Sequence, residues 1–378
     1  MFRTAFEFWA AASVSTLFLA AIATTSARAD TFLYVSQAPE QAIRIYRMND
    51  ADGSLADVET VAVDGTPGAS SVDQTGKFLF VSLRSTSKIG SFRIDGGTGK
   101  LTLVNTTQLV GGANAAYVRT DRTGKFLFSA SYAGGRVVVH ALDSEGRIGA
   151  EPLEVIETAK TAHCVAVDAA NQIVYVPHVA PNVVYQFRFN AATGQLAPLE
   201  DTVGGSVNGQ VPGGRNSPDG KLAGPRHLAF HPTGKAAFTS DESGSSVSMY
   251  GVFQGRGLIW LSTFSTLPAD YRGKNTTAEV KAHPSGKFLW VSNRGHDSLA
   301  GFEYLGRKEG LKPLGQTPTE PTPRSFDIDP SGRFLFAAGE GSGKLQAYAI
   351  DETTGRLTPT KKYDVGKSLT WVTASKLK

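Results

Sequence analysis

The chain has a single cysteine, no long run of like charges, and no long segment of helical apolar periodicity beyond its first thirty residues. Cys164 has no second cysteine to pair with, so no intrachain disulfide can stabilise the fold. It stands in the alternating sequence His-Cys-Val-Ala-Val, which is typical of a small buried side chain on a strand. Nothing adjacent in sequence would activate its thiol, so we do not expect a catalytic cysteine.

Charged residues are nearly balanced, with 38 basic and 34 acidic side chains and a net charge of +4. None of them form a run of five or six like charges, so the composition does not support nucleic-acid binding. His178, His283 and His296 are not spaced as a metal-ligand set. We therefore predict neither a metal nor a cofactor.

Residues 1–29 have the pattern of a cleavable export signal. Arg3 precedes an apolar run at residues 10–23, and Ala27-Arg28-Ala29 before Asp30 fits a small-x-small cleavage site, although Glu7 is unusual in such a segment. The run is shorter than the roughly 18 apolar residues needed to cross a membrane. We expect a mature chain of residues 30–378 that is periplasmic or secreted and has no membrane contact after cleavage.

Seven short apolar strands recur along the chain, each centred on an aromatic residue or flanked by one. The marker aromatics are Tyr34, Phe80, Phe128, Tyr175, Phe238, Trp290 and Phe336. They lie 46, 48, 47, 63, 52 and 46 residues apart. A period of about 40 to 50 residues with several strands per unit predicts an all-β, seven-bladed β-propeller.

A second series of turns has the same count. A glycine followed by a basic or polar residue, and then usually by an aliphatic one, lies about 19 residues after each marker aromatic. These glycines are Gly53, Gly99, Gly146, Gly194, Gly257, Gly310 and Gly355. The repeats continue without a linker, which predicts one domain over residues 30–378. The longest step holds a Gly- and Asn-rich insertion at about 199–224, interpreted as either a functional lid or disordered decoration.

The two ends of the mature chain complete each other. Residues 369–374 resemble an innermost strand without outer partners, and residues 31–36 resemble a second strand without an innermost one. Pairing them in one blade would close the ring and leave no free strand edge at the seam.

The turn residues also locate a candidate site. Counting back eight residues from Asn171, Gly234 and Gly332 reaches His163, Arg226 and Arg324, which therefore share one register in three blades. Counting forward eight residues from the six turn residues reaches Arg84, Tyr132, Val179, Glu242, Arg294 and Glu340. In an antiparallel hairpin both positions lie at the open end, so these side chains should ring the face opposite the turns.

This ring of charge has two interpretations. The arginines and glutamates could form interblade ion pairs around the axis, as buried charges usually do. Alternatively they line a polar pocket, in which Arg226, Arg294 and Arg324 would bind an acceptor group and His163, His227 and Glu242 would titrate.

The string Gly224-Pro-Arg-His-Leu-Ala-Phe-His-Pro232 resembles the seven-bladed propeller lactonases, a family that includes a bacterial 6-phosphogluconolactonase and fungal carboxy-muconate lactonizing enzymes. Asn293-Arg294-Gly295, Thr322-Pro-Arg-Ser-Phe326 and the repeated Asp-x-x-Gly turns carry the resemblance further, over about residues 31–374. It implies hydrolysis of a small sugar or sugar-acid lactone.

The resemblance assigns catalytic roles to His163, Arg226, Glu242 and Arg324. His163 would act as base, the two arginines would stabilise the oxyanion or clamp an acidic group, and Glu242 would serve as acid or orient His163. Substrate-binding positions complete the prediction: His227, Asn293, Arg294 and Glu340. Two alternatives are a non-catalytic exported propeller that binds an anionic ligand or protein partner, and an enzyme that closes lactones. A monomer is expected.

Overall fold

The computed structural model describes residues 1–2, 30–203, 208–214 and 222–377. Most of the predicted signal segment and parts of the predicted insertion lie outside these residues. The described chain holds 29 strands and two short 3₁₀ helices, η1 (Arg84–Thr86) and η2 (Val110–Gly112). A search of those segments finds no helix with the length and apolarity needed to span a membrane.

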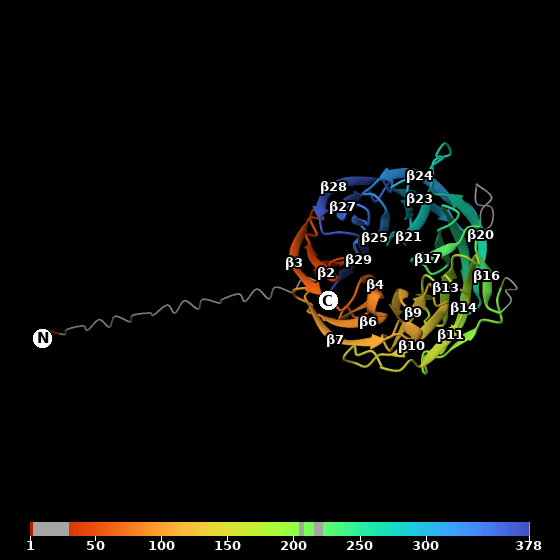
Figure 1. Cartoon of the computed structure of the whole chain (residues 1–378). Helices are drawn as coiled ribbons and strands as arrows, with labels where there is room; N and C mark the ends of the chain where they lie inside the picture. Colours follow the sequence, from red (N-terminus) through yellow and green to blue (C-terminus); the bar gives the residue numbers. More distant parts are fainter. Residues whose placement is uncertain (3–29, 204–207, 215–221, 378) are drawn as a thin grey trace.

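Seven antiparallel sheets are arranged as blades around a ring (Figure 1). From its innermost to its outermost strand, the first blade contains β29 (Leu369–Lys376), β1 (Thr31–Gln37), β2 (Ala42–Met48) and β3 (Leu55–Ala62). In the same inside-to-outside order, the second contains β4 (Pro67–Val72), β5 (Phe78–Leu83), β6 (Lys88–Ile94) and β7 (Leu101–Gln108). The third contains β8 (Ala115–Thr120), β9 (Phe126–Ser131), β10 (Arg136–Ala141) and β11 (Glu154–Glu157).

The remaining four blades continue in the same order. The fourth contains β12 (Ala166–Val167), β13 (Ile173–His178), β14 (Val183–Phe189) and β15 (Leu196–Pro198). The fifth contains β17 (Pro225–Phe230), β18 (Ala236–Asp241), β19 (Ser246–Phe253) and β20 (Gly257–Ser265). The sixth contains β21 (Thr276–Ala282), β22 (Phe288–Arg294), β23 (Ser298–Gly306) and β24 (Gly310–Pro318). The seventh contains β25 (Pro323–Ile328), β26 (Phe334–Gly339), β27 (Lys344–Ile350) and β28 (Leu357–Asp364).

The predicted blade count and ring closure are confirmed. β1 pairs with β29 from Thr31↔Lys376 to Gln37↔Leu369, so the first and last strands of the ring share one sheet. The predicted insertion adds a fifth strand to the fourth blade, because β16 (Gln210–Pro212) pairs with β14.

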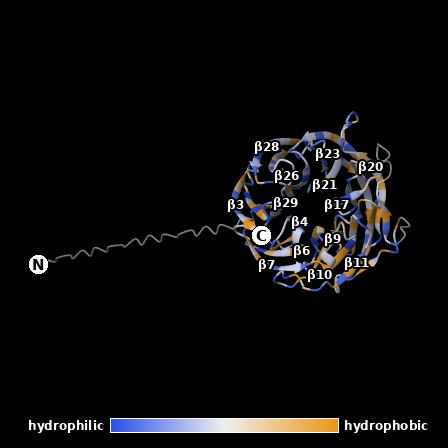
Figure 2. Cartoon of the chain, viewed as in Figure 1, coloured by the Kyte–Doolittle hydropathy of each residue, from blue (hydrophilic) through white to orange (hydrophobic). Residues whose placement is uncertain are grey.

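The second strand of each blade is buried on both faces, since a neighbouring blade packs on each side. All seven residues of β1 and all six of β5, β9 and β18 are buried. This explains why these strands are nearly continuous apolar runs instead of alternating sequences. Hydrophobic residues accordingly run through the sheets around the whole ring (Figure 2).

Six of the seven repeated turn glycines pack against an aromatic ring of the adjoining blade, whereas Gly257 meets Gln186 and Leu199. Gly99 has φ of 71°, and a Cβ there would lie 2.2 Å from the ring of buried Phe32. Gly146 meets Phe78 in the same way in the next blade. The two series share one period because all seven glycines adopt a left-handed turn conformation and all but Gly257 allow this contact between a glycine and an aromatic ring.

Candidate active site

β-bulges lie near the first residues of two innermost strands, β17 and β25. The pairing of β17 with β18 shifts between Pro225 and His227, and that of β25 with β26 shifts between Pro323 and Ser325. Arg226 and Arg324 therefore occupy the bulges. A bulge bends its strand and re-aims the side chain, and bulges are frequent beside active sites. In Figure 1 the innermost strands β17, β21, β25, β29 and β4 surround the centre of the ring.

Arg226 is the central cation of the site and is only 1% exposed. Its Nη1 donates to the carbonyl of Ala278 at 2.8 Å and lies 3.0 Å from Nε2 of His227. Its Nε lies 3.2 Å from Oε2 of Glu242, an ion pair without hydrogen-bond alignment. Burial, and then the guanidinium groups of Arg324 and Arg294, lower the pKa of Arg226 to about 9, so it remains charged at neutral pH.

Glu242 joins two blades. Besides Arg226 in its own blade, it contacts Nη2 of Arg294 in the sixth blade, with 3.1 Å between Oε1 and that nitrogen. Arg294 also donates from Nη2 to the carbonyl of Thr277 at 2.9 Å. Among the described contacts Glu242 has none with His163, so the geometry gives it a different role from orienting that ring: it holds two arginines in place.

Arg324 and Glu340 form a further ion pair, in the seventh blade. Arg324 Nη1 lies 3.7 Å from Glu340 Oε2, and both side chains are partly exposed, at 22% and 28%. Burial lowers the pKa of Arg324, and the neighbouring Arg294 and Arg84 lower it further, against the opposing effect of Glu340. Of these three ion pairs, only that of Glu242 with Arg294 joins two blades as the ion-pair interpretation expected, because Arg226–Glu242 and Arg324–Glu340 each form within one blade.

His163 stands beside this cluster, just before β12. Its backbone N–H donates to the carbonyl of Pro177 at 3.0 Å, and its ring lies 5.1 Å from that of His227 and 5.5 Å from that of Tyr132. Burial, reinforced by Arg226 and His227, lowers the pKa of His163 well below its ordinary value. The imidazole is therefore neutral at neutral pH, and its Nδ1 has no hydrogen-bond partner in the described part of the chain.

Two predicted substrate-binding residues are already engaged by other protein groups. His227 is 2% exposed, and its ring nitrogens meet Arg226 and Glu279. Asn293 is fully buried, and its amide bonds Thr266, Asn275 and Ser298. Among the described residues, neither side chain has a polar atom left to bind a ligand. The hydrogen bonds of Asn293 instead hold the segment after β20, and those of His227 hold Arg226.

Three residues near the site were not among those predicted. Tyr132 and Arg84 follow the ends of β9 and β5, at the forward register position that also marks Glu242 and Arg294. The forward count from the turns reaches both residues, although neither was assigned a role in the site from the sequence. Glu279 shares the register of His227, one residue after the counted position, but nothing in its local sequence suggests a site.

Polar atoms without a hydrogen bond accumulate in the region lined by these residues, here called the mouth, although two of them, Nε of Arg226 and Oε2 of Glu242, face each other as an ion pair. Within the described segments, the buried atoms without a hydrogen bond include Nε of Arg84, Arg226 and Arg294, Oε2 of Glu242 and Nδ1 of His163. Buried polar groups are normally satisfied, so such a cluster is typical of a site that receives a ligand or water. Four guanidinium groups against the two carboxylates of Glu242 and Glu340 favour an anionic or oxygen-rich ligand.

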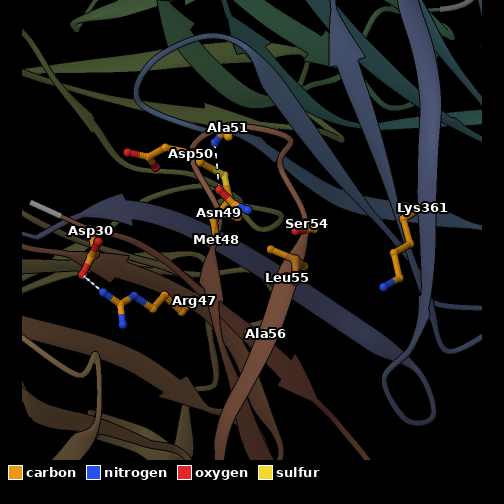
Figure 3. A pocket seen from close by; sticks show the side chains of 10 residues that line it. All are labelled: Asp30, Arg47, Met48, Asn49, Asp50, Ala51, Ser54, Leu55, Ala56 and Lys361. Carbon is orange, nitrogen blue, oxygen red and sulfur yellow. Dashed lines mark hydrogen bonds and ion pairs between the residues drawn. The ribbon is translucent and has the colours of Figure 1, made fainter.

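Apart from the mouth, two other kinds of site concern the described residues: a metal site and a second pocket. No group of three or more His, Cys, Asp or Glu residues there is placed to hold a metal ion. Figure 3 shows a pocket of about 460 Å³ at the β2–β3 hairpin, where Asp30 pairs with Arg47 and Lys361 lies on β28. It contains none of the mouth residues.

The fold defines a seven-bladed β-propeller, and its mouth gathers an imidazole and several guanidinium groups. The chain belongs to the seven-bladed β-propeller lactonase family, whose family model matches residues 10–114 and 105–374. The predicted resemblance is thereby confirmed, and the chain is a lactonase, a hydrolase of carboxylic esters.

Individual relatives agree with this assignment. The chain is 32% identical over 341 residues to 6-phosphogluconolactonase of Pectobacterium carotovorum, covering 90% of this chain and 97% of that protein. It is 33% identical over 342 residues to 6-phosphogluconolactonase of Yersinia pestis, covering 90% and 96%. The solved structure of periplasmic gluconolactonase from Pseudomonas aeruginosa superposes with a TM-score of 0.81 at 23% identity, covering 92% of this chain and all of that one.

Proposed function

We propose that this lactonase hydrolyses a non-phosphorylated sugar or sugar-acid lactone outside the cytoplasm. The export pattern of residues 1–29 separates the chain from phosphorylated metabolites, although curated relatives are named for a phosphorylated lactone. A structural neighbour bears the name periplasmic gluconolactonase, which matches the proposed setting. The surplus of guanidinium groups at the mouth supports a ligand rich in hydroxyl or carboxylate oxygens.

The observation that carries the proposed mechanism is a neutral imidazole beside fixed positive charge. In this mechanism His163 accepts a proton from water as the oxygen attacks the ring carbonyl. Arg226 and Arg324 stabilise the oxyanion that forms. When the carbon–oxygen bond of the ring ester breaks, the protonated His163 returns its proton to the leaving alkoxide. The product is the open-chain hydroxy acid, and no other group needs to change charge.

Glu242 and Arg294 have supporting roles in this scheme. A carboxylate between two guanidinium groups restrains both, and preorganised charge stabilises a transition state without reorganisation at the moment of reaction. Glu340 would restrain Arg324 in the same way. Tyr132, packed against His163, would shield one side of the base.

The decisive experiment measures acid release from δ-gluconolactone, its 6-phosphate and an aldarolactone, with spontaneous hydrolysis subtracted. We expect catalysis with the non-phosphorylated lactones, and the 6-phosphate as the best substrate would contradict the proposed class. Arg226→Ala should lower kcat by roughly a hundredfold or more if Arg226 stabilises the oxyanion, because removing one such donor costs about 10²–10³. A rise in KM alone would instead make Arg226 a ground-state binder.

Two further variants complete this test. His163→Ala should remove most of the pH-dependent rate, because the proposed base is lost. Arg47→Ala in the pocket of Figure 3 is the control and should leave the rate unchanged. Tight binding of an aldonate by a protein that accelerates no hydrolysis would support the non-catalytic binding alternative, and net formation of lactone from the acid would support the ring-closing one.

A further inference from the structure

Three buried side chains form a hydrogen-bonded row next to the proposed oxyanion site. Glu279 Oε1 lies 2.9 Å from Nδ1 of His227, and Nε2 of His227 lies 3.0 Å from Nη1 of Arg226. The three side chains are 3%, 2% and 1% exposed. Glu279 comes from β21 and the other two from β17, so the row crosses the interface between the fifth and sixth blades.

The chemistry of the row determines where each proton lies. A guanidinium can only donate, so Nε2 of His227 must accept from Arg226 and carry no hydrogen. The neutral ring then carries its proton on Nδ1, which donates to Glu279. Burial, and then Arg226, lower the pKa of His227 well below its ordinary value, which agrees with a neutral ring. Glu279 is thus the acceptor that selects the tautomer of His227 in which Nε2 can accept a hydrogen bond from Arg226.

Besides Glu279 and Arg226, the described neighbours of the His227 ring include three other rings, those of His163, Tyr117 and Trp371. The His227 ring packs edgewise on Tyr117 at 5.3 Å and lies 5.5 Å from the ring of Trp371. Without Glu279, the Nδ1 proton would have no described partner, and the competing tautomer would place a hydrogen on Nε2 facing the Arg226 guanidinium.

The row also determines which part of Arg226 faces the ligand. Nη1 uses its hydrogens on the Ala278 carbonyl and on His227, and Nε is directed toward Glu242. For Nη2 no hydrogen bond occurs anywhere in the described residues. A guanidinium held at three points with its last amino group free suits the donation of hydrogen bonds to a developing oxyanion.

Burial of the Glu279 carboxylate costs free energy that its packing contacts alone would not explain. Its only ion-pair partner in the described chain is the neutral His227, and its Oε2 has no hydrogen bond. Lys281, on the same strand, pairs with Asp327 at 3.1 Å instead. A buried carboxylate without a cation in contact is costly. Glu279 also lines a pocket of about 400 Å³ on the face of the Pro-x-Gly turns, which gives its charge a route to solvent.

We propose that Glu279 is a positioning residue for lactone hydrolysis, which orients Arg226 by holding His227 in the Nδ1–H tautomer. This inference rests on the proposed role of Arg226. It predicts that the hydrogen-bond acceptor at position 279 matters more than its charge. A glutamine there retains a carbonyl oxygen for Nδ1–H, whereas a leucine of similar size retains none.

The test compares Glu279→Gln with Glu279→Leu in the mature full-length chain, at a temperature well below both unfolding midpoints. Glu279→Leu should lower kcat by roughly ten- to a hundredfold with little change in KM, because a misdirected catalytic group has this effect. Glu279→Gln should recover activity to within about threefold of the unmutated protein. Equal impairment of the two variants, or full activity of Glu279→Leu, would overturn the proposal.

Two controls separate this outcome from others. Asp121→Asn removes a buried turn carboxylate on the opposite face, which accepts backbone N–H groups of Lys125 and Phe126, and should lower Tm without changing kcat. Long-range ¹H–¹⁵N spectra of histidine-labelled protein report the tautomer of His227 directly. They should show Nδ1–H in the unmutated protein and in Glu279→Gln but not in Glu279→Leu, a result independent of whether any lactone is cleaved. An Nε2–H tautomer in the unmutated protein would refute the proposal even if the lactone assay succeeds.

Discussion

Ending the chain at Ser368 tests the closure of the ring. This truncation removes β29, which is the innermost strand of the first blade and the hydrogen-bonding partner of β1. β29 also bonds both neighbouring blades: the Thr370 hydroxyl donates to the Pro67 carbonyl at 2.8 Å, and the Ala374 N–H donates to Asp327 at 3.0 Å. The seam therefore depends on one strand.

The expected loss is comparable to the whole net stability of a native protein. The deleted segment contains four almost fully buried apolar side chains, those of Leu369, Trp371, Val372 and Leu377. At about 1.5–3 kcal/mol each, their burial contributes on the order of 6–12 kcal/mol. The net stability of a native protein is only about 5–15 kcal/mol. The truncated chain should therefore lack a cooperative native state, and the bared edge of β1 should promote association.

Circular dichroism during thermal unfolding and light scattering at fixed concentration measure these two consequences. We expect a loss of the cooperative transition together with an increase in scattering. Lys376→Ala, which changes an exposed residue of the same strand, should leave both signals unchanged. A monomeric truncation product with a sharp unfolding transition would show that β29 does not hold the ring closed.

Three further outcomes follow from the same structure. Gly99→Ala should destabilise the fold by about 2–5 kcal/mol in thermal unfolding, because the new side chain combines a positive φ with a clash against a buried ring. In the control Gly112→Ala the new Cβ meets no atom within 4 Å, so the strain of the positive φ, about 1–2 kcal/mol, should be the only cost. Stability should fall as pH decreases from about 6.5 toward 4, since burial lowers the pKa of His140 and of His178 to about 4 and the unfolded chain then binds more protons than the folded one. Asp241 partly opposes this trend, because burial raises its pKa to about 7. An unfolding midpoint that stays constant or rises on acidification would contradict the predicted net loss of stability. The aldonate product should inhibit hydrolysis competitively through its carboxylate, and the neutral alditol of the same length should inhibit much less. Equal inhibition by the two would remove the case for anion recognition.

The sequence by itself determined the architecture, because the signals for it are local and repeated. Each second strand is largely apolar because it is buried on both faces, and a turn glycine such as Gly99 is required by its own backbone conformation and by the ring packed on it. The register counted from those turns brought His163, Arg226, Glu242 and Arg324 to one face for the same reason: hairpin geometry is set by a few neighbouring residues.

Only the tertiary structure decided how the site is organised. Glu279 and His227 are 52 residues apart and meet only because the fifth and sixth blades pack side by side. The bulges at Arg226 and Arg324 arise in the pairing of strands, and the hydrogen bond of Asn293 to Thr266 forms only when the fifth and sixth blades pack together. Contacts between blades depend on the relative placement of distant strands, and no local pattern in the chain encodes that placement.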